Sequence, residues 1–242
     1  MIPIDGGQGT AFRAGALVLK PVDVDNIWLL DFLAELRPPD DLRVVRPVQT
    51  PGGRLVVDGW SAWAWLEGQP DGSRWRDALV VSTSLHALLV DVPDPRMRRS
   101  DPWAIADRWV WGDASITVPD VARLLVDRIR DAQVEVTEPS QLIHADLCGN
   151  VLYHPDRPPA VIDVSPLWRP KRYADAIIVL DAVSWWSAEG SAVAALGDDV
   201  GVQMLLRAAL FRIGAAALIF DGHPERLAVE ADHYERALGP VL

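Results

Sequence analysis

The chain has 242 residues, of which 50% are apolar and 24% are charged. This composition excludes a disordered chain, and the length suits one large domain or two small lobes with a sizeable core. A formal net charge of −11 disfavours nucleic acid and anionic membranes as partners, since both bind basic patches.

Three further features bear on the cellular compartment. A single cysteine leaves no internal disulfide, which fits a reducing environment. No apolar run reaches the roughly 18 residues of a membrane span. The N-terminal segment lacks the basic start and apolar core of a signal peptide. The sequence therefore predicts a cytoplasmic protein that binds neither nucleic acid nor membrane.

A glycine-rich segment lies near the N-terminus, with glycines at Gly6, Gly7 and Gly9. Glycine lets a backbone approach a phosphate closely and tolerates positive φ. An apolar run over residues 17–19 follows and ends on Lys20. The pattern predicts a glycine-rich turn and then a strand carrying Lys20, with a flexible tail as the alternative. Only five residues precede the glycines, so any strand before them is expected to be short or absent.

The next segment, residues 24–36, has apolar residues recurring near a period of 3.6, which predicts a helix. Asp31 and Glu35 are four positions apart and therefore lie on the same side of this helix. Both are acids that either face solvent or pair with a nearby cation.

Strands are predicted at 42–49 and 54–66, and a Pro-Gly-Gly turn at 51–53 joins them into a hairpin over 44–60. Helical periodicity dominates the remainder of the chain. The predicted helices cover residues 75–89, 100–112, 118–132, 174–188, 200–220 and 224–238. His86 is expected at the surface or the core edge, and the proline-containing segment 165–172 is expected to be a loop.

The stretch from Leu142 to Asp163 carries the chemistry. Two short β-runs, 151–153 and 160–162, are separated by a polar turn and predict a hairpin. This hairpin would bring Asp146, Asn150 and Asp163 towards one edge. A carboxylate within reach of a hydroxyl orients it and accepts its proton, and carboxylate and amide oxygens are ligands that suit Mg²⁺.

These residues resemble the motifs of the aminoglycoside phosphotransferase family, within the protein-kinase-like superfamily. The catalytic loop of that family usually reads His-Gly-Asp, four residues, then Asn. Here His144-Ala145-Asp146 is followed by three residues before Asn150. The metal-binding aspartate of the family ends an apolar strand, as Asp163 does after Ile162. The shortened loop before Asn150 departs from the family pattern, whereas Asp163 follows it.

The resemblance implies roles for the residues of the central stretch. Asp146 would orient and deprotonate the acceptor hydroxyl, while His144 would position the loop. Asp163 and Asn150 would hold Mg²⁺. In the family an aspartate at about this point of the chain braces the catalytic loop, and Asp175 would match it.

The same resemblance implies a nucleotide site in the N-terminal part. Gly6, Gly7 and Gly9 would cover the phosphates of ATP, and Lys20 would contact its α- and β-phosphates. Lys20 normally pairs with an acid on the following helix, for which Asp31 is favoured and Glu35 is the alternative. The segment from Ala64 to Glu67 would form the hinge, where the main chain at Ala64 and Leu66 binds adenine.

The sequence therefore predicts an α+β, two-lobed protein-kinase-like fold, with a small β-rich N-lobe over 1–66 and a mainly helical C-lobe over 67–242. The predicted function is ATP-dependent transfer of the γ-phosphate to a hydroxyl of a small molecule. A kinase-like nucleotide-binding module with weak or no activity is the alternative. A metal-dependent phosphoesterase is a poorer hypothesis, because the remaining histidines are scattered.

Residues 181–242 carry nine acids and four arginines. This acidic segment would attract a cationic substrate or would form a solvated surface.

Overall fold

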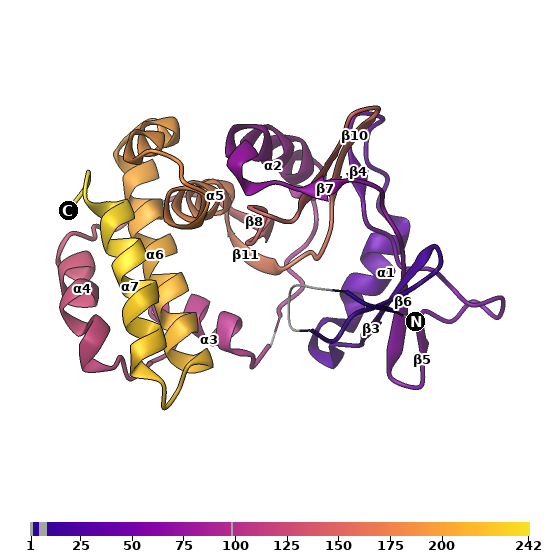
Figure 1. Ribbon diagram of the computed structural model, residues 1–242, viewed down its shortest axis with the longest axis horizontal. Helices are drawn as coiled ribbons and strands as arrows, with labels where there is room; N and C mark the ends of the chain where they lie inside the picture. The colour runs from indigo at the N-terminus through magenta and orange to yellow at the C-terminus, as the bar shows by residue number, and fades with distance from the viewer. Residues whose placement is uncertain (1, 5–8, 98) are drawn as a thin grey trace. The chain divides into compact units, whose positions relative to one another are not determined.

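The computed structural model describes residues 2–4, 9–97 and 99–242. The chain divides into two compact units (Figure 1). Unit 1 comprises Met1–Pro70, Arg96–Arg98 and Asn150–Asp163, and unit 2 comprises Asp71–Pro95, Arg99–Gly149 and Val164–Leu242. The β-rich N-terminal region and helical C-terminal region confirm the predicted α+β class. The predicted lobe boundary at residues 66 and 67 stays a prediction, since the units defined by packing assign 67–70 and 150–163 to the N-terminal side.

The first sheet of unit 1 has the strand order β1-β2-β3-β6-β5. These strands are β1 (Ile2–Pro3), β2 (Phe12–Ala14), β3 (Leu17–Pro21), β5 (Val56–Val57) and β6 (Trp60–Ala64). Strand β1 pairs antiparallel with β2 and has only two residues, so the first strand is present but short. Because β3 pairs with β6 in the register Lys20↔Ser61, the side chain of Lys20 is fixed to one face of this sheet.

Helix α1 (Ile27–Glu35) follows β3 after a short 3₁₀ turn, η1 (Val24–Asn26), and confirms the predicted helix. Leu29, Leu30 and Leu33 form its buried face, while Asp31 and Glu35 are exposed. The 3₁₀ turn η1 begins after Asp23, whose side chain accepts a hydrogen bond from the amide of Asp25.

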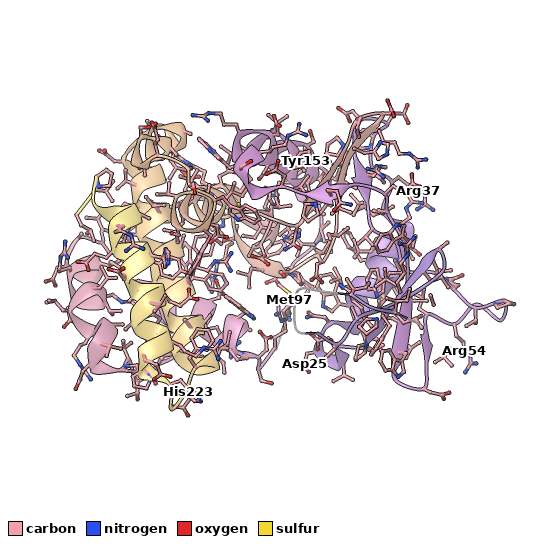
Figure 2. All side chains as sticks on the ribbon, viewed as in Figure 1. Asp25, Arg37, Arg54, Met97, Tyr153 and His223 are labelled. Carbon is pink, nitrogen blue, oxygen red and sulfur yellow. The ribbon has the colours of Figure 1, made fainter. Side chains whose placement is uncertain are left out.

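The predicted hairpin over 44–60 is only partly right. Residues 46–48 do pair with 62–64, through Val48 N to Ala62 O at 2.7 Å and Ala64 N to Arg46 O at 2.9 Å. The intervening chain makes a longer excursion, whose exposed tip carries Arg54 (Figure 2). It returns through β5 and a tight turn at Asp58-Gly59, where both residues have positive φ. An Asp-Gly pair favours this two-residue turn, so the hairpin formed by β5 and β6 closes there.

The second sheet of unit 1 has the order β4-β10-β9-β7, formed by β4 (Arg43–Val44), β7 (Gln69–Pro70), β9 (Val151–His154) and β10 (Arg157–Val161). Strands β9 and β10 form the hairpin predicted from the central stretch. Strand β4 runs parallel to β10. Gly68 lies beside this sheet with φ +140°, and a Cβ there would lie 2.9 Å from Leu152 Cβ. Only glycine fits that close approach.

Unit 2 is mainly helical. Its helices are α2 (Trp75–Leu89), α3 (Pro102–Val110), α4 (Asp120–Asp131), α5 (Lys171–Trp185), α6 (Asp199–Ile219) and α7 (Pro224–Leu238), with 3₁₀ turns η2 (Gly72–Arg74) and η3 (Gly190–Leu196). The predicted start of α3 is confirmed, because Asp101 caps the amides of Trp103 and Ala104 and Pro102 takes the first helical position.

Strands β8 (Ser140–His144) and β11 (Pro166–Pro170) form a two-stranded antiparallel sheet in unit 2. The prediction of a loop at 165–172 is therefore wrong. Proline lacks the N–H needed for a central strand but is tolerated at strand ends and edges. Both strands of a two-stranded sheet are edges, and Pro166 and Pro170 stand at the two ends of β11.

Helix α6 is the core helix of unit 2 and packs against α3, α5 and α7, of which α7 lies beside it in Figure 1. It is long and apolar enough to cross a membrane by length and composition, but 72% of the relevant window is buried within the structure. Core helices pass the same test. Arg207 and Arg212 interrupt its apolar sequence, and both are buried.

Candidate active site

Two groups of polar side chains correspond to the site predicted from the sequence, one in each unit. Lys20, Asn150 and Asp163 belong to unit 1, whereas His144 and Asp146 belong to unit 2. Each group is built by its own strands and is described separately. The convergence of Asp146 with Asp163 stays a prediction.

In unit 1, Lys20 forms an ion pair with Asp163, with Nζ 2.8 Å from Oδ1. These residues are 143 positions apart in the chain. Strand β3 supplies the lysine, and the aspartate follows the end of β10. Asp163 has φ +51°, a left-handed conformation that aspartate tolerates better than most residues. Their side chains are 33% and 56% exposed, so both remain accessible to a ligand.

Asn150 lies next to Asp163 through the β9–β10 hairpin. The register pairs Val151 with Val161, and one step further the amide of Ile162 donates to the carbonyl of Asn150 at 3.0 Å. The hairpin therefore places Asn150 beside the residue that precedes Asp163. Their carboxylate and amide oxygens are hard donors that fit Mg²⁺.

The described residues contain no group of three or more His, Cys, Asp and Glu side chains able to hold a metal. A magnesium ion at Asp163 and Asn150 would therefore need oxygens from a bound phosphate or from water, as Mg²⁺ commonly does.

The predicted pair between Lys20 and an acid of α1 is not formed within the described part of the chain. Lys20 pairs with Asp163 there, while Asp31 and Glu35 make no ion pair. The physical reason is the orientation of α1, because its leucines take the buried face and leave both acids on the exposed side.

The glycine segment and hinge are described in part. Gly6 and Gly7 lie outside the described residues, and Gly9 is exposed with φ +68°. Ala64 already donates its amide to Arg46 O at 2.9 Å. Among the described residues, the N–H and C=O of Leu66 form no hydrogen bond with another main-chain group. The contacts of Ala64 and Leu66 with adenine stay a prediction.

In unit 2, the loop carrying Asp146 is held at its start by His144. His144 is fully buried at the end of β8, and its Nδ1 accepts from the amide of Asp146 at 3.1 Å. The amide of Ala145 donates to Ser165 O at 2.9 Å. These bonds fix the backbone of the loop at its start. The positioning role of His144 in a reaction stays a prediction.

A second histidine, His86 on α2, accepts a hydrogen bond from the main chain at the start of this loop. Its Nε2 accepts from the amide of His144 at 3.0 Å. Burial, together with His144 and Lys171, lowers the pKa of His86 to about 3, so the ring is neutral. The proton then lies on Nδ1, which donates to Ser82 Oγ at 3.0 Å.

The network continues from Ser82 to Asp175 and Lys171. Ser82 Oγ donates to Asp175 Oδ1 at 2.7 Å, and Lys171 Nζ pairs with Asp175 Oδ2 at 2.7 Å. Asp175 therefore reaches the loop through two side chains of α2. The expectation that His86 lies at the surface or core edge is wrong, since only 2% of it is exposed. Its spacing of four from Ser82 and three from Leu89, on the buried face of α2, was the available signal.

The carboxylate of Asp146 is anchored by Arg212 of α6, whose Nη2 donates to Oδ1 at 2.7 Å. The same guanidinium holds Asp181 of α5 in a two-point contact, with Nε donating to Oδ1 at 3.0 Å. Arg212 and Asp181 are buried, whereas the side chain of Asp146 is 39% exposed. Asp146 is thus fixed from the protein side and reachable from solvent.

The charges in this cluster depend on burial and on each other. Burial raises the pKa of Asp181 to about 6, although Arg212 opposes that change. Burial works to lower the pKa of Arg212, but Asp181 and Asp146 together raise it well above its usual value. Arg212 is therefore a permanent cation. Neither Arg212 nor Asp181 was predicted, because a polar pair inside apolar helices gives no periodic signal.

The only cysteine of the sequence, Cys148, lies in the same loop and has a protonated thiol. Burial, with Asp181 and Asp146 nearby, raises the pKa of its thiol far above neutrality. The thiolate is the reactive form of cysteine, so the protonated thiol argues against covalent cysteine chemistry here.

No protein family model matches the chain, and no curated protein matches it in sequence. Solved structures do match it in fold. A thermostable mutant of aminoglycoside phosphotransferase APH(4)-Ia has 14% identity and a TM-score of 0.66, covering 99% of this chain and 94% of that one. Amicoumacin kinase hAmiN, in complex with AMP-PNP, Ca²⁺ and Ami, has 15% identity and a TM-score of 0.60, covering 99% and 91%.

Choline kinase LicA from Streptococcus pneumoniae has 13% identity and a TM-score of 0.56, covering 98% of this chain and 91% of that one. These identities are low, and the similarity is one of three-dimensional arrangement over almost the whole chain. The resemblance found in the sequence is confirmed at the level of the fold: the chain has the fold of the aminoglycoside phosphotransferase, amicoumacin kinase and choline kinase structures.

Proposed function

We propose that this chain is an ATP-dependent phosphotransferase that moves the γ-phosphate to a hydroxyl of a small molecule. The observation that carries the proposal is the 2.8 Å pair of Lys20 with Asp163. A strand-borne lysine and a strand-ending aspartate are the phosphate and metal contacts of the phosphoryl-transfer template. The folds of the matching kinases and the loop at Asp146 support the same function.

In the proposed mechanism, Asp146 orients the acceptor hydroxyl and accepts its proton as the oxygen attacks the γ-phosphorus. The bond from that phosphorus to the bridging oxygen breaks, and ADP leaves. Lys20 would contact the α- and β-phosphates, and Asp163 with Asn150 would hold Mg²⁺. The ion, when bound, neutralises charge that develops on the phosphate oxygens.

Arg212 adds a feature of this chain to the mechanism. By holding one oxygen of Asp146, it fixes the direction of the carboxylate relative to the loop. Positioning of a catalytic group contributes strongly to rate, since misplacement by about 1 Å can cost roughly 10²-fold.

The acceptor is proposed to be a small molecule carrying a hydroxyl and, given the acidic C-terminal segment, a positive charge. Amino sugars, amino alcohols and nucleosides form the panel to test. Cytoplasmic location, with no nucleic acid or membrane partner, is proposed on the composition and charge of the chain.

The experiment is ATP turnover over this panel, comparing the natural chain with Asp146→Asn, which keeps the size of the side chain. Loss of a general base predicts a fall of about 10²–10⁴-fold in kcat with an unchanged KM for ATP. Equal turnover in both proteins would contradict the role of Asp146.

A second candidate is a kinase-like nucleotide-binding module with little transfer activity. Two observations favour it. The loop from Asp146 to Asn150 is one residue shorter than the loop of the aminoglycoside phosphotransferase pattern, and Arg212 already pairs with Asp146. Calorimetry with ATP and Mg²⁺ separates the two. Tight binding without transfer to any acceptor supports the module, whereas turnover supports the enzyme.

A further inference from the structure

Unit 1 contains a cavity of about 390 Å³ whose lining includes none of Lys20, Asn150 and Asp163. Its walls include three arginines, Arg13, Arg43 and Arg157, together with Trp65, Leu66 and Glu67. Three guanidiniums around one carboxylate give a local excess of positive charge in a chain whose net charge is −11. The volume lies in the range of small-ligand sites, roughly 300–1,000 Å³.

The hydrogen bonds of the three arginines leave this positive charge largely unbalanced. Arg157 pairs with Glu67, 3.0 Å apart. Arg43, which is half-buried, donates to the carbonyls of Pro158 and Glu67 at 2.8 and 2.9 Å. Arg13 donates to Gly15 O and places its guanidinium 3.8 Å from the ring centroid of Trp65. Within the described residues, only Arg157 has a carboxylate partner.

The pKa of Arg43 also reflects an excess of positive charge in the cavity. Burial lowers the pKa of Arg43, the neighbouring Arg157 lowers it further, and Glu67 opposes with a smaller effect. Repulsion between Arg43 and Arg157 therefore exceeds the attraction of the one carboxylate. A bound anion would relieve this repulsion.

The cavity is separate from the pair formed by Lys20 and Asp163. Ala16, at the cavity, precedes β3, while Lys20 lies near the other end of that strand. Arg157 begins β10, and Asp163 follows the end of the same strand. At about 3.3 Å per residue, the two strands separate the cavity from the pair by roughly 13 to 20 Å.

We propose that this cavity binds a phosphate monoester of a small organic molecule. The phosphate would lie between Arg43 and Arg157, whose planar guanidiniums donate in the two-point geometry that phosphate oxygens accept. A monoester carries nearly two negative charges at pH 7, which balances the excess of two guanidiniums. The organic part would lie along Trp65 and Leu66, which supply the apolar wall.

Phenyl phosphate is the probe, and its affinity is measured by calorimetry on the full chain. Arg157→Gln and Glu67→Gln form a matched pair, because each removes the same ion pair at an exposed position. Arg157→Gln should weaken binding by about tenfold, since a charge-assisted bond is lost. Glu67→Gln should strengthen it. An effect of altered structure alone would move both variants in the same direction and would overturn the proposal.

Two controls test the role of the phosphate and the separation of the site from Lys20. Phenol, which lacks the phosphate, should not bind detectably, and Lys20→Met should leave the affinity for phenyl phosphate unchanged. Absence of binding by phenyl phosphate at millimolar concentration, equal binding of phenol, or loss of binding in Lys20→Met would each overturn the proposal.

Discussion

Arg212 donates to Asp146 Oδ1 at 2.7 Å, and with the same guanidinium it holds the buried Asp181. One cation therefore serves two carboxylates, of which one is buried and the other is 39% exposed. Only the exposed carboxylate is able to meet an acceptor. The buried one keeps the arginine in place.

Arg212→Gln should strongly destabilise unit 2, because it leaves Asp181 buried without a cation. Breaking one side of a buried ion pair costs about 3–5 kcal/mol of unfolding free energy. Chemical denaturation measures this cost. The double variant Arg212→Met with Asp181→Leu should recover much of the stability, since neither charge remains.

The double variant also separates folding from catalysis. It should remain folded but lose roughly 10²-fold in kcat, because Asp146 has lost its anchor. KM for ATP should stay unchanged. A folded double variant with the natural kcat would show that Arg212 has no positioning role.

Acid should destabilise the protein through His86. Its pKa is about 3 in the fold and about 6.5 in an unfolded chain, so the unfolded state binds the proton first. The contribution of the neutral ring is fully present above pH 6.5 and is lost as pH falls towards 3. The slope reaches about 1.4 kcal/mol per pH unit.

Denaturant unfolding at several pH values tests this expectation, with His86→Gln as the variant. The variant should be less stable at pH 7 and should show a shallower decline between pH 6.5 and 3. Asp181 works in the opposite sense, since its pKa is raised to about 6 and its stability cost grows as pH rises towards that value. Asp181→Asn therefore serves as the control, and it should make the net acid-induced decline steeper.

The pair of Lys20 with Asp163 should matter for ligand binding more than for folding. Because both side chains are partly exposed, removing the pair should change stability by about 0–1 kcal/mol. Lys20→Met should weaken ATP binding with or without Mg²⁺. Asp163→Asn should remove only the part of the affinity that Mg²⁺ adds.

Calorimetry with ATP, in the presence and absence of Mg²⁺, measures both effects. A Mg²⁺ enhancement that persists in Asp163→Asn would assign the metal to other residues. An Asp163→Asn variant that loses ATP affinity equally in both conditions would indicate that the carboxylate acts through Lys20.

Gly68→Ala should destabilise unit 1 by several kcal/mol. The new Cβ would lie 2.9 Å from Leu152 Cβ and 3.0 Å from Tyr153 O, in a backbone with φ +140°. Gly53→Ala is the matched control, because its φ is also positive and a Cβ there meets nothing within 4 Å. The control should cost only about 1–2 kcal/mol of backbone strain. Equal midpoints of thermal unfolding in the two variants would contradict the packing argument.

Local pattern was enough to predict much of the fold. The helices α2, α4 and α7 follow from apolar residues at a period of 3.6, and the β9–β10 hairpin follows from two β-runs around a polar turn. Pattern was not enough at β11, where two prolines indicated a loop. That strand exists because β8 accepts it as an edge partner, which no feature of residues 166–170 specifies alone.

For the site, the sequence by itself determined which residues carry suitable chemistry. Lys20, His144, Asp146, Asn150 and Asp163 are readable because they lie beside short apolar runs at a recognisable spacing. Only the tertiary structure decided their partners. Lys20 pairs with Asp163 rather than with Asp31, and Arg212 reaches Asp146 from a helix 66 positions away in the chain. Partner choice depends on which helix faces are buried and which strands pair, and these follow from packing summed over the whole chain, so no local stretch encodes them.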